Sequence, residues 1–178
     1  MEPPALIEKY YEKDSRAYEL LVKHSTLVAR KALAIVNAHP ELAIDAAFVY
    51  EAAMLHDIGV FLTDADDIGC FGDYPYICHG YLGAELLRRE GLYRHALVCE
   101  RHTGAGISLE KIEENGLPLP RRDMRPVSVE ERLICYADKF YSKTKIDHEK
   151  PLERIIKGLE KRGKGSVKRF VDWHNLFS

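Results

Sequence analysis

The stretch LAIDAAFVYEAAMLHDIG, residues 42–59, is the most apolar part of this 178-residue chain. Its pattern predicts a helix from about 42 to 58 that stops at Gly59. His56 follows apolar residues at the i−3, i−4 and i−7 positions, so it faces inward at the helix end, and Asp57 comes directly after it. Because the stretch also carries acidic side chains, we do not expect it to span a membrane.

Helical patterns continue on both sides of this stretch, separated by Gly and Pro breaks. We find no alternating strand pattern of useful length, and residues 60–78 are expected to form a long surface loop that acts as a lid or a specificity loop. The expected class is therefore all-α, a compact helical bundle. The other expected helices are a short one ending near Lys13, then 15–38, 79–90, 92–103, 109–115, 129–145 with Ser128 and Glu131 as a capping box, one starting at Pro151, and 166–177.

Length and composition indicate one folded domain, 1–178, with a core at about 15–145 and a C-terminal helical extension at 146–178. The chain is 46% hydrophobic and 30% charged, which excludes a disordered protein. The net charge of −2 argues against nucleic acid as a partner and against binding to membranes through overall charge. Four cysteines without a C-x-x-C pair are read as reduced thiols, and with no apolar leader we expect a cytoplasmic protein.

Several ionisable side chains occupy positions where apolar residues belong. His24 is flanked by leucines and a valine at i±3 and i±4, His102 follows an apolar pair, and Asp138 lies on an apolar helix face. A buried carboxylate is costly unless it is paired or bound to a metal. One such residue is ordinarily a structural core residue. Several on separate helices indicate a metal site with imidazole and carboxylate ligands.

The ordered set His24, His56-Asp57 and Asp138, with the string His56-Asp57-Ile58-Gly59, resembles the HD-domain superfamily of metal-dependent phosphohydrolases, in its HDIG form. The match covers roughly residues 20 to 145. His79-Gly80 and Arg101-His102 resemble the two extra histidines of HD members that hold two metals. By this resemblance, one ion is held by His24, His56, Asp57 and Asp138, and Asp57 bridges to a second ion held also by His79 and His102.

The resemblance implies a catalytic centre built around Asp57, with one or two divalent transition metals (Fe, Mn, Zn, Ni or Co) as cofactor. Two such ions share a hydroxide that acts as the nucleophile on a phosphoester or phosphoanhydride. We therefore expect the substrate to be a small, nucleotide-like phosphorylated molecule, with a homodimer left open.

No basic residue follows the His-Asp pair, where many HD phosphohydrolases carry a lysine, so phosphate contacts are expected from Arg101, Lys139 and Lys143. Residues 143–170 hold ten Lys and Arg against four Asp and Glu. Such a run favours nucleotides or RNA, but it is more often the solvated face of helices.

Three alternatives stay open at this point. The same six-ligand set occurs in HD relatives that are di-iron oxygenases. The site is also compatible with a non-catalytic nucleotide sensor. The third alternative is an enzyme with one metal, in which His79 and His102 are structural.

Overall fold

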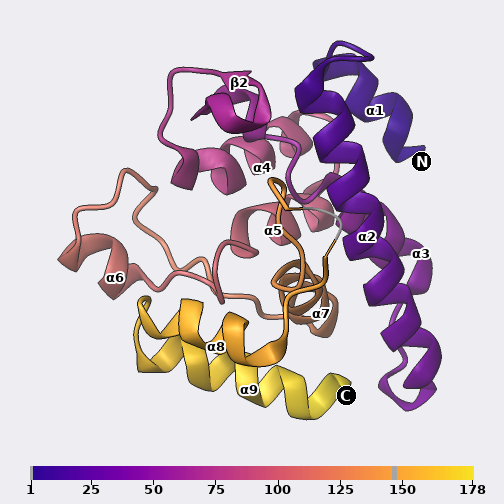
Figure 1. The fold of residues 1–178 in the computed structure, drawn as a ribbon, viewed down its shortest axis with the longest axis vertical. Coiled ribbons are helices and arrows are strands. Elements are labelled where there is room, and N and C mark those ends of the chain that lie inside the picture. The colour runs from indigo at the N-terminus through magenta and orange to yellow at the C-terminus, as the bar shows by residue number, and fades with distance from the viewer. Residues whose placement is uncertain (1, 146–147) are drawn as a thin grey trace.

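The computed structural model describes residues 2–145 and 148–178. Within them the chain forms nine α-helices, which confirms the all-α class (Figure 1). The helices are α1 (Pro3–Tyr10), α2 (Arg16–Ala38), α3 (Ala46–Leu55), α4 (His79–Arg89), α5 (Tyr93–Arg101), α6 (Leu109–Glu114), α7 (Val129–Asp138), α8 (Leu152–Glu160) and α9 (Lys164–Phe177).

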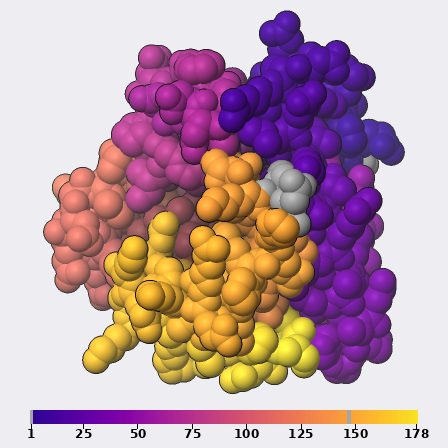
Figure 2. All heavy atoms as spheres, in the orientation of Figure 1, coloured from indigo at the N-terminus to yellow at the C-terminus, as the bar shows by residue number. Residues whose placement is uncertain are grey.

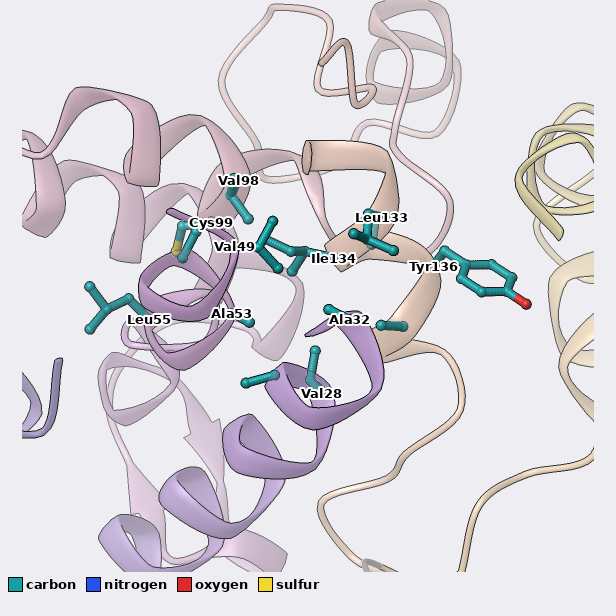
Figure 3. Packing of buried hydrophobic residues seen from close by; sticks show 14 of the residues in the cluster. Val28, Ala32, Val49, Ala53, Leu55, Val98, Cys99, Leu133, Ile134 and Tyr136 are labelled. Atoms are coloured by element: carbon teal, nitrogen blue, oxygen red, sulfur yellow. The ribbon is translucent and has the colours of Figure 1, made fainter. Parts of the chain in front are cut away.

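The central helices meet in one apolar core, to which α2, α3, α5 and α7 each turn a face (Figure 3). Val28 comes from α2, Val49 from α3, Val98 from α5 and Ile134 from α7, and all four are buried. Helix α3 is buried along most of its length, in keeping with its apolar sequence. The metal-type residues predicted from sequence lie on the helices that share this core, so core packing fixes their relative positions.

Short polar caps set the starts of the long helices. The Ser15 hydroxyl accepts a hydrogen bond from the Tyr18 amide, and the Asp45 carboxylate accepts one from the Phe48 amide. Ser128 accepts from the Glu131 amide, as the predicted capping box requires. The reciprocal bond differs, because the Glu131 carboxylate accepts from the amide of Val127 and not from that of Ser128.

Two predicted boundaries were wrong by four residues or more. Residues 40–42 form a separate 3₁₀ turn, so α3 begins at Ala46 and not near residue 42. Helix α7 ends at Asp138 and not near residue 145, because the next amides bond three residues back and the chain unwinds. This early end lets the segment after α7 fold over the His and Asp residues.

The region predicted as a loop, 60–78, contains three 3₁₀ turns and a small hairpin. Strands β1 (Asp64–Ala65) and β2 (Cys70–Phe71) pair antiparallel, with Asp64 opposite Phe71 and Ala65 opposite Cys70. Strands this short leave no alternating pattern for the sequence to reveal.

Helices α8 and α9 lie together beside α7 (Figure 1). Phe170, Trp173 and Phe177 of α9 are buried in the same core as α2 and α3, and the ring of Tyr136 on α7 stacks on Phe170. No helix among the described residues is both long enough and apolar enough to cross a membrane.

Candidate metal centre

Five helices bring six buried His and Asp side chains to one point. Five of these residues lie at a helix end or within two residues of one, where the backbone turns and adjacent side chains converge. His24 lies within α2, His56 and Asp57 follow α3, His79 opens α4, His102 follows α5, and Asp138 is the last residue of α7.

Three of the histidines are oriented by the same local contact. His56 Nδ1 lies 2.6 Å from the carbonyl oxygen of Ala53, and His79 Nδ1 lies 2.6 Å from that of Tyr76. His102 Nδ1 lies 2.7 Å from the carbonyl oxygen of Cys99. A carbonyl oxygen only accepts, so Nδ1 carries the proton and donates it. The Nε2 atom of each ring is then the free ligand atom, and it points into the cluster, as metal-ligating histidines require.

The first group consists of His24, His56, Asp57 and Asp138, whose ligand atoms all lie within 4.8 Å of one another. His24 Nε2 is 2.9 Å from Asp138 Oδ1 and 3.3 Å from Asp57 Oδ2. His56 Nε2 is 3.0 Å from Asp57 Oδ2. Two imidazoles and two carboxylates thus surround one point, a donor set that suits zinc, iron or manganese.

The second group consists of Asp57, His79 and His102. The Nε2 atom of His79 is 3.3 Å from Asp57 Oδ1, and that of His102 is 3.2 Å from the same oxygen. The two Nε2 atoms are 3.1 Å from each other. One oxygen of Asp57 therefore belongs to each group. A carboxylate shared in this way is the expected bridge between two ions.

Whether each of these atoms donates or accepts hydrogen bonds shows whether a metal ion fits between them. In neutral His79 and His102 the two Nε2 lone pairs face each other and face a carboxylate oxygen, so every atom at this point is an acceptor. His56 Nε2 and both Asp57 oxygens are also buried without a hydrogen bond of good geometry. Around Asp57 Oδ1, buried acceptors converge without a donor, and a divalent metal held there would satisfy them. In the first group, Asp57 Oδ2 also lies 2.6 Å from the Lys143 ammonium.

Burial and neighbouring charges set the protonation states of the His and Asp side chains in the centre. Burial lowers the pKa of His79 to about 3 and also lowers the pKa of His102, so both rings are neutral. Burial disfavours a charged Asp57, but His56 and Lys143 outweigh it and hold the pKa of Asp57 well below its usual range. Burial also disfavours a charged His56, but the Asp57 and Asp138 carboxylates outweigh it and raise the pKa of His56 to about 9, so this ring must lose a proton when a metal binds. The centre therefore combines ionised carboxylates with neutral His79 and His102.

A cavity of about 310 Å³ opens onto the cluster. It is large enough for a small ligand. Its polar lining is supplied on one side by the 60–78 segment and on the other by the chain that follows α7. Lining residues include His24, Tyr76, Asp138, Lys139, Tyr141 and Lys143.

The three residues predicted to bind phosphate lie in different places. Lys143 Nζ is 2.6 Å from Asp57 Oδ2, and it donates to the Tyr76 hydroxyl at 3.0 Å. Lys139 Nζ is 2.6 Å from Asp138 Oδ2. Both lysines line the cavity. Arg101 does not, because its guanidinium bonds Glu131 at 2.9 Å, and we leave it out of the proposed site.

Sequence reasoning missed two features of the centre. The Tyr76 ring lies against the His79 ring, with 4.6 Å between ring centroids and a tilt of 30°, and nothing in the loop sequence marks it. Gly59 packs directly on α4, where a Cβ atom would lie 2.3 Å from the Gly83 nitrogen and from the His79 oxygen. Because Gly59, the glycine of the His-Asp-Ile-Gly string, has no side chain, α4 can pack directly against the chain that follows His56 and Asp57. This contact brings His79, the first residue of α4, to the centre.

Comparison with known proteins agrees with this geometry. The HD domain family model matches residues 21–143. The uncharacterized protein MJ0778 of Methanocaldococcus jannaschii is 35% identical, over 86% of this chain and 85% of that protein. No solved structure matches the chain.

Two further relatives are named tRNA (cytidine(56)-2'-O)-methyltransferase. The one from Picrophilus torridus is 32% identical over 79% of this chain, and the one from Thermoplasma volcanium is 29% identical over 91%. The matched segments cover 37% and 43% of those proteins, so this chain spans less than half their length. The family match and the buried His and Asp cluster lead to the same conclusion: this chain belongs to the HD-domain family.

Proposed function

We propose that this protein is a metal-dependent phosphohydrolase that cleaves a phosphoester or phosphoanhydride bond of a nucleotide-like small molecule. The observation that carries the proposal is Asp57, whose two buried oxygens are divided between two groups of metal-type ligands. Divalent ions held in these groups would supply a water of lowered pKa and would neutralise charge on a phosphoryl oxygen.

The chain's own residues complete such a site. Lys139 and Lys143 present ammonium groups beside the two carboxylates, where they can bind the oxygens of a substrate phosphate. Asp57 and Asp138 hold these ammonium groups in place. Tyr76 and Tyr141 line the same cavity and offer aromatic faces for a nucleobase.

The names of two relatives also support a nucleotide as substrate. Those proteins are named for methyl transfer to a cytidine of tRNA, and each contains a segment similar to this chain. Nucleotides and their phosphorylated derivatives are therefore the first substrates to screen.

The test combines metal analysis with activity. Protein purified without oxygen and without a metal-binding tag is expected to hold about two ions per chain, and His79→Ala to hold one or fewer. Phosphate release from nucleotides should be lost in Asp57→Asn and kept in His39→Ala, since His39 lies on the surface against Glu41. Circular dichroism checks that each variant retains its helices.

Other outcomes would contradict the proposal. Full turnover in Asp57→Asn would exclude the shared carboxylate from the chemistry. Oxygen uptake by iron-loaded protein without phosphate release would favour an oxygenase. Binding of metal and nucleotide without any turnover would favour a sensor.

A further inference from the structure

The cavity at the metal centre is the first of three that follow one another along the surface. The second, of about 350 Å³, shares Lys139 and Lys150 with the first. The third, of about 450 Å³, shares Gly104 and Arg162 with the second. The shared residues place the three hollows next to one another, in a row that starts beside Asp138, and we treat this row as one groove.

Positive charge follows this groove. The first cavity contains Asp67 and Asp138, but no Asp or Glu is among the residues that line the second and third. We call the second and third cavities, with their shared edges, the basic groove. In order from the metal centre its cationic residues are Lys139, Lys150, Arg154, Arg162, Lys161 and Lys111.

Most of these cations have no acidic partner. Within the described residues, no carboxylate lies within 4.0 Å of the charged nitrogens of Lys111, Arg154, Lys161 or Arg162. Outside the groove, some of the arginines that the structure describes do have a carboxylate within 4.0 Å. Arg88 and Arg122, for example, both pair with the buried Glu100. Charge that is left unpaired and gathered on one face indicates an anionic ligand.

The Arg162 side chain lies against the backbone of the groove at Gly104. Gly104 has φ 65°, and a Cβ atom there would lie 3.1 Å from a guanidinium nitrogen of Arg162. Helix α9 begins beside the third cavity, next to Gly163, and no side chain caps it. Its positive end adds to the attraction that the lysines and arginines exert on a phosphate.

The size of the groove exceeds what a mononucleotide needs. The first cavity alone holds a small ligand beside the metal centre. The two further cavities would then have no role, although they carry the unpaired cations. A ligand with phosphates repeated along its length would contact all three.

We infer that the basic groove binds the phosphodiester backbone of a single-stranded oligonucleotide, with one end of the strand at the His and Asp centre. The inference rests on the proposed function, whose substrate it extends from a nucleotide to a strand. It also reverses the expectation from net charge, because four of the ten Lys and Arg in residues 143–170 line the basic groove, and no Asp or Glu lines it. On the side shown in Figure 2 the segment around residue 140 and α8 lie at the surface, in orange and yellow.

The experiment measures fluorescence anisotropy of labelled 12-nucleotide single strands, as RNA and as DNA, and uses AMP as an unlabelled competitor. The variant Arg154→Glu/Arg162→Glu reverses two exposed groove charges, and Lys157→Glu reverses an exposed charge outside the groove, on the helix that carries Arg154. We expect the double variant to weaken binding at least tenfold. We also expect the dependence of log K on log salt to be less steep by about 1. Lys157→Glu should change affinity less than twofold.

Binding of RNA and DNA with equal affinity would support recognition of the backbone, and preference for RNA would support recognition of the strand together with its 2'-hydroxyls. The inference is overturned if AMP competes as well as an unlabelled 12-mer, or if both charge reversals weaken binding equally. The same measurements distinguish failure of this inference from failure of the proposed function. Wild-type protein that binds strands but releases no phosphate refutes the hydrolase and leaves the groove, whereas release of phosphate from nucleotides without strand binding does the opposite.

Discussion

Replacing Gly59 by alanine should displace α4 and impair the second group of ligands while leaving the fold intact. The added Cβ would lie 2.3 Å from the Gly83 nitrogen and from the His79 carbonyl oxygen. Both atoms belong to the backbone, so no side-chain rotation relieves the contact.

The displacement follows from ordinary contact distances. Non-bonded heavy atoms rest about 3.5 Å apart, so α4 must retreat by about 1 Å. His79 is the first residue of α4, and its Nε2 lies 3.3 Å from Asp57 Oδ1. Metal–ligand distances tolerate only about 0.2 Å, so a shift of this size breaks coordination by His79. The strain should also lower the free energy of unfolding by about 1–3 kcal/mol.

Two measurements on one sample test both effects. Urea unfolding followed by circular dichroism gives the change in stability, and elemental analysis after anaerobic loading gives metal per chain. We expect Gly59→Ala to lose about one ion relative to wild type. Gly158→Ala is the matched control, because no heavy atom lies within 4 Å of the added Cβ and the residue lies within α8. It should keep the metal content and raise stability by about 0.5–1 kcal/mol.

The reasoning is refuted if Gly59→Ala is as stable as wild type and binds the same amount of metal. Loss of stability with full metal content would show that α3 and α4 separate without moving His79. Loss of all metal would place the displacement at Asp57 rather than at α4.

Three further predictions concern stability. Ser128→Ala removes the hydroxyl that accepts the Glu131 amide at 3.1 Å and should cost about 1 kcal/mol in urea unfolding; no loss would exclude a role for this cap. Phe170→Ala empties a fully buried position between α7 and α9 and should cost about 3–5 kcal/mol, seen as a lower Tm, and an unchanged Tm would contradict the packing of α9 on the core. Divalent metal at 100 times its Kd should stabilise the folded protein by about 2.7 kcal/mol, an effect that EDTA reverses. In His79→Ala the stabilisation should be smaller, and an equal effect would exclude His79 as a ligand.

The predicted helices were largely confirmed because their signals are local. Caps such as Ser15 and Ser128 and the apolar spacing of α2 act within a few residues, so the sequence alone reveals them. The wrong boundaries lie where contacts between residues distant in the sequence set the end of a helix. The end of α7 at Asp138 depends on how the following chain folds back toward Asp57.

The candidate site also has a part that the sequence predicted and a part that it did not. The order of His24, His56-Asp57 and Asp138 in the sequence led to the HD family, which the family match confirms. Sequence spacing did not indicate that Arg101 would turn toward Glu131, nor that the Tyr76 ring would lie against the His79 ring. These contacts join segments that the chain itself does not place together.

By itself, therefore, the sequence determined the helical class, the family and the identities of the six ligand-type residues, since these depend on residue type and short spacing. Only the tertiary structure divided Asp57 between two groups of ligands, set Gly59 against α4 and brought Arg154 and Arg162 to one cavity. The physical reason is that each of these arrangements depends on how helices distant in the chain pack, and packing is decided by the whole core at once.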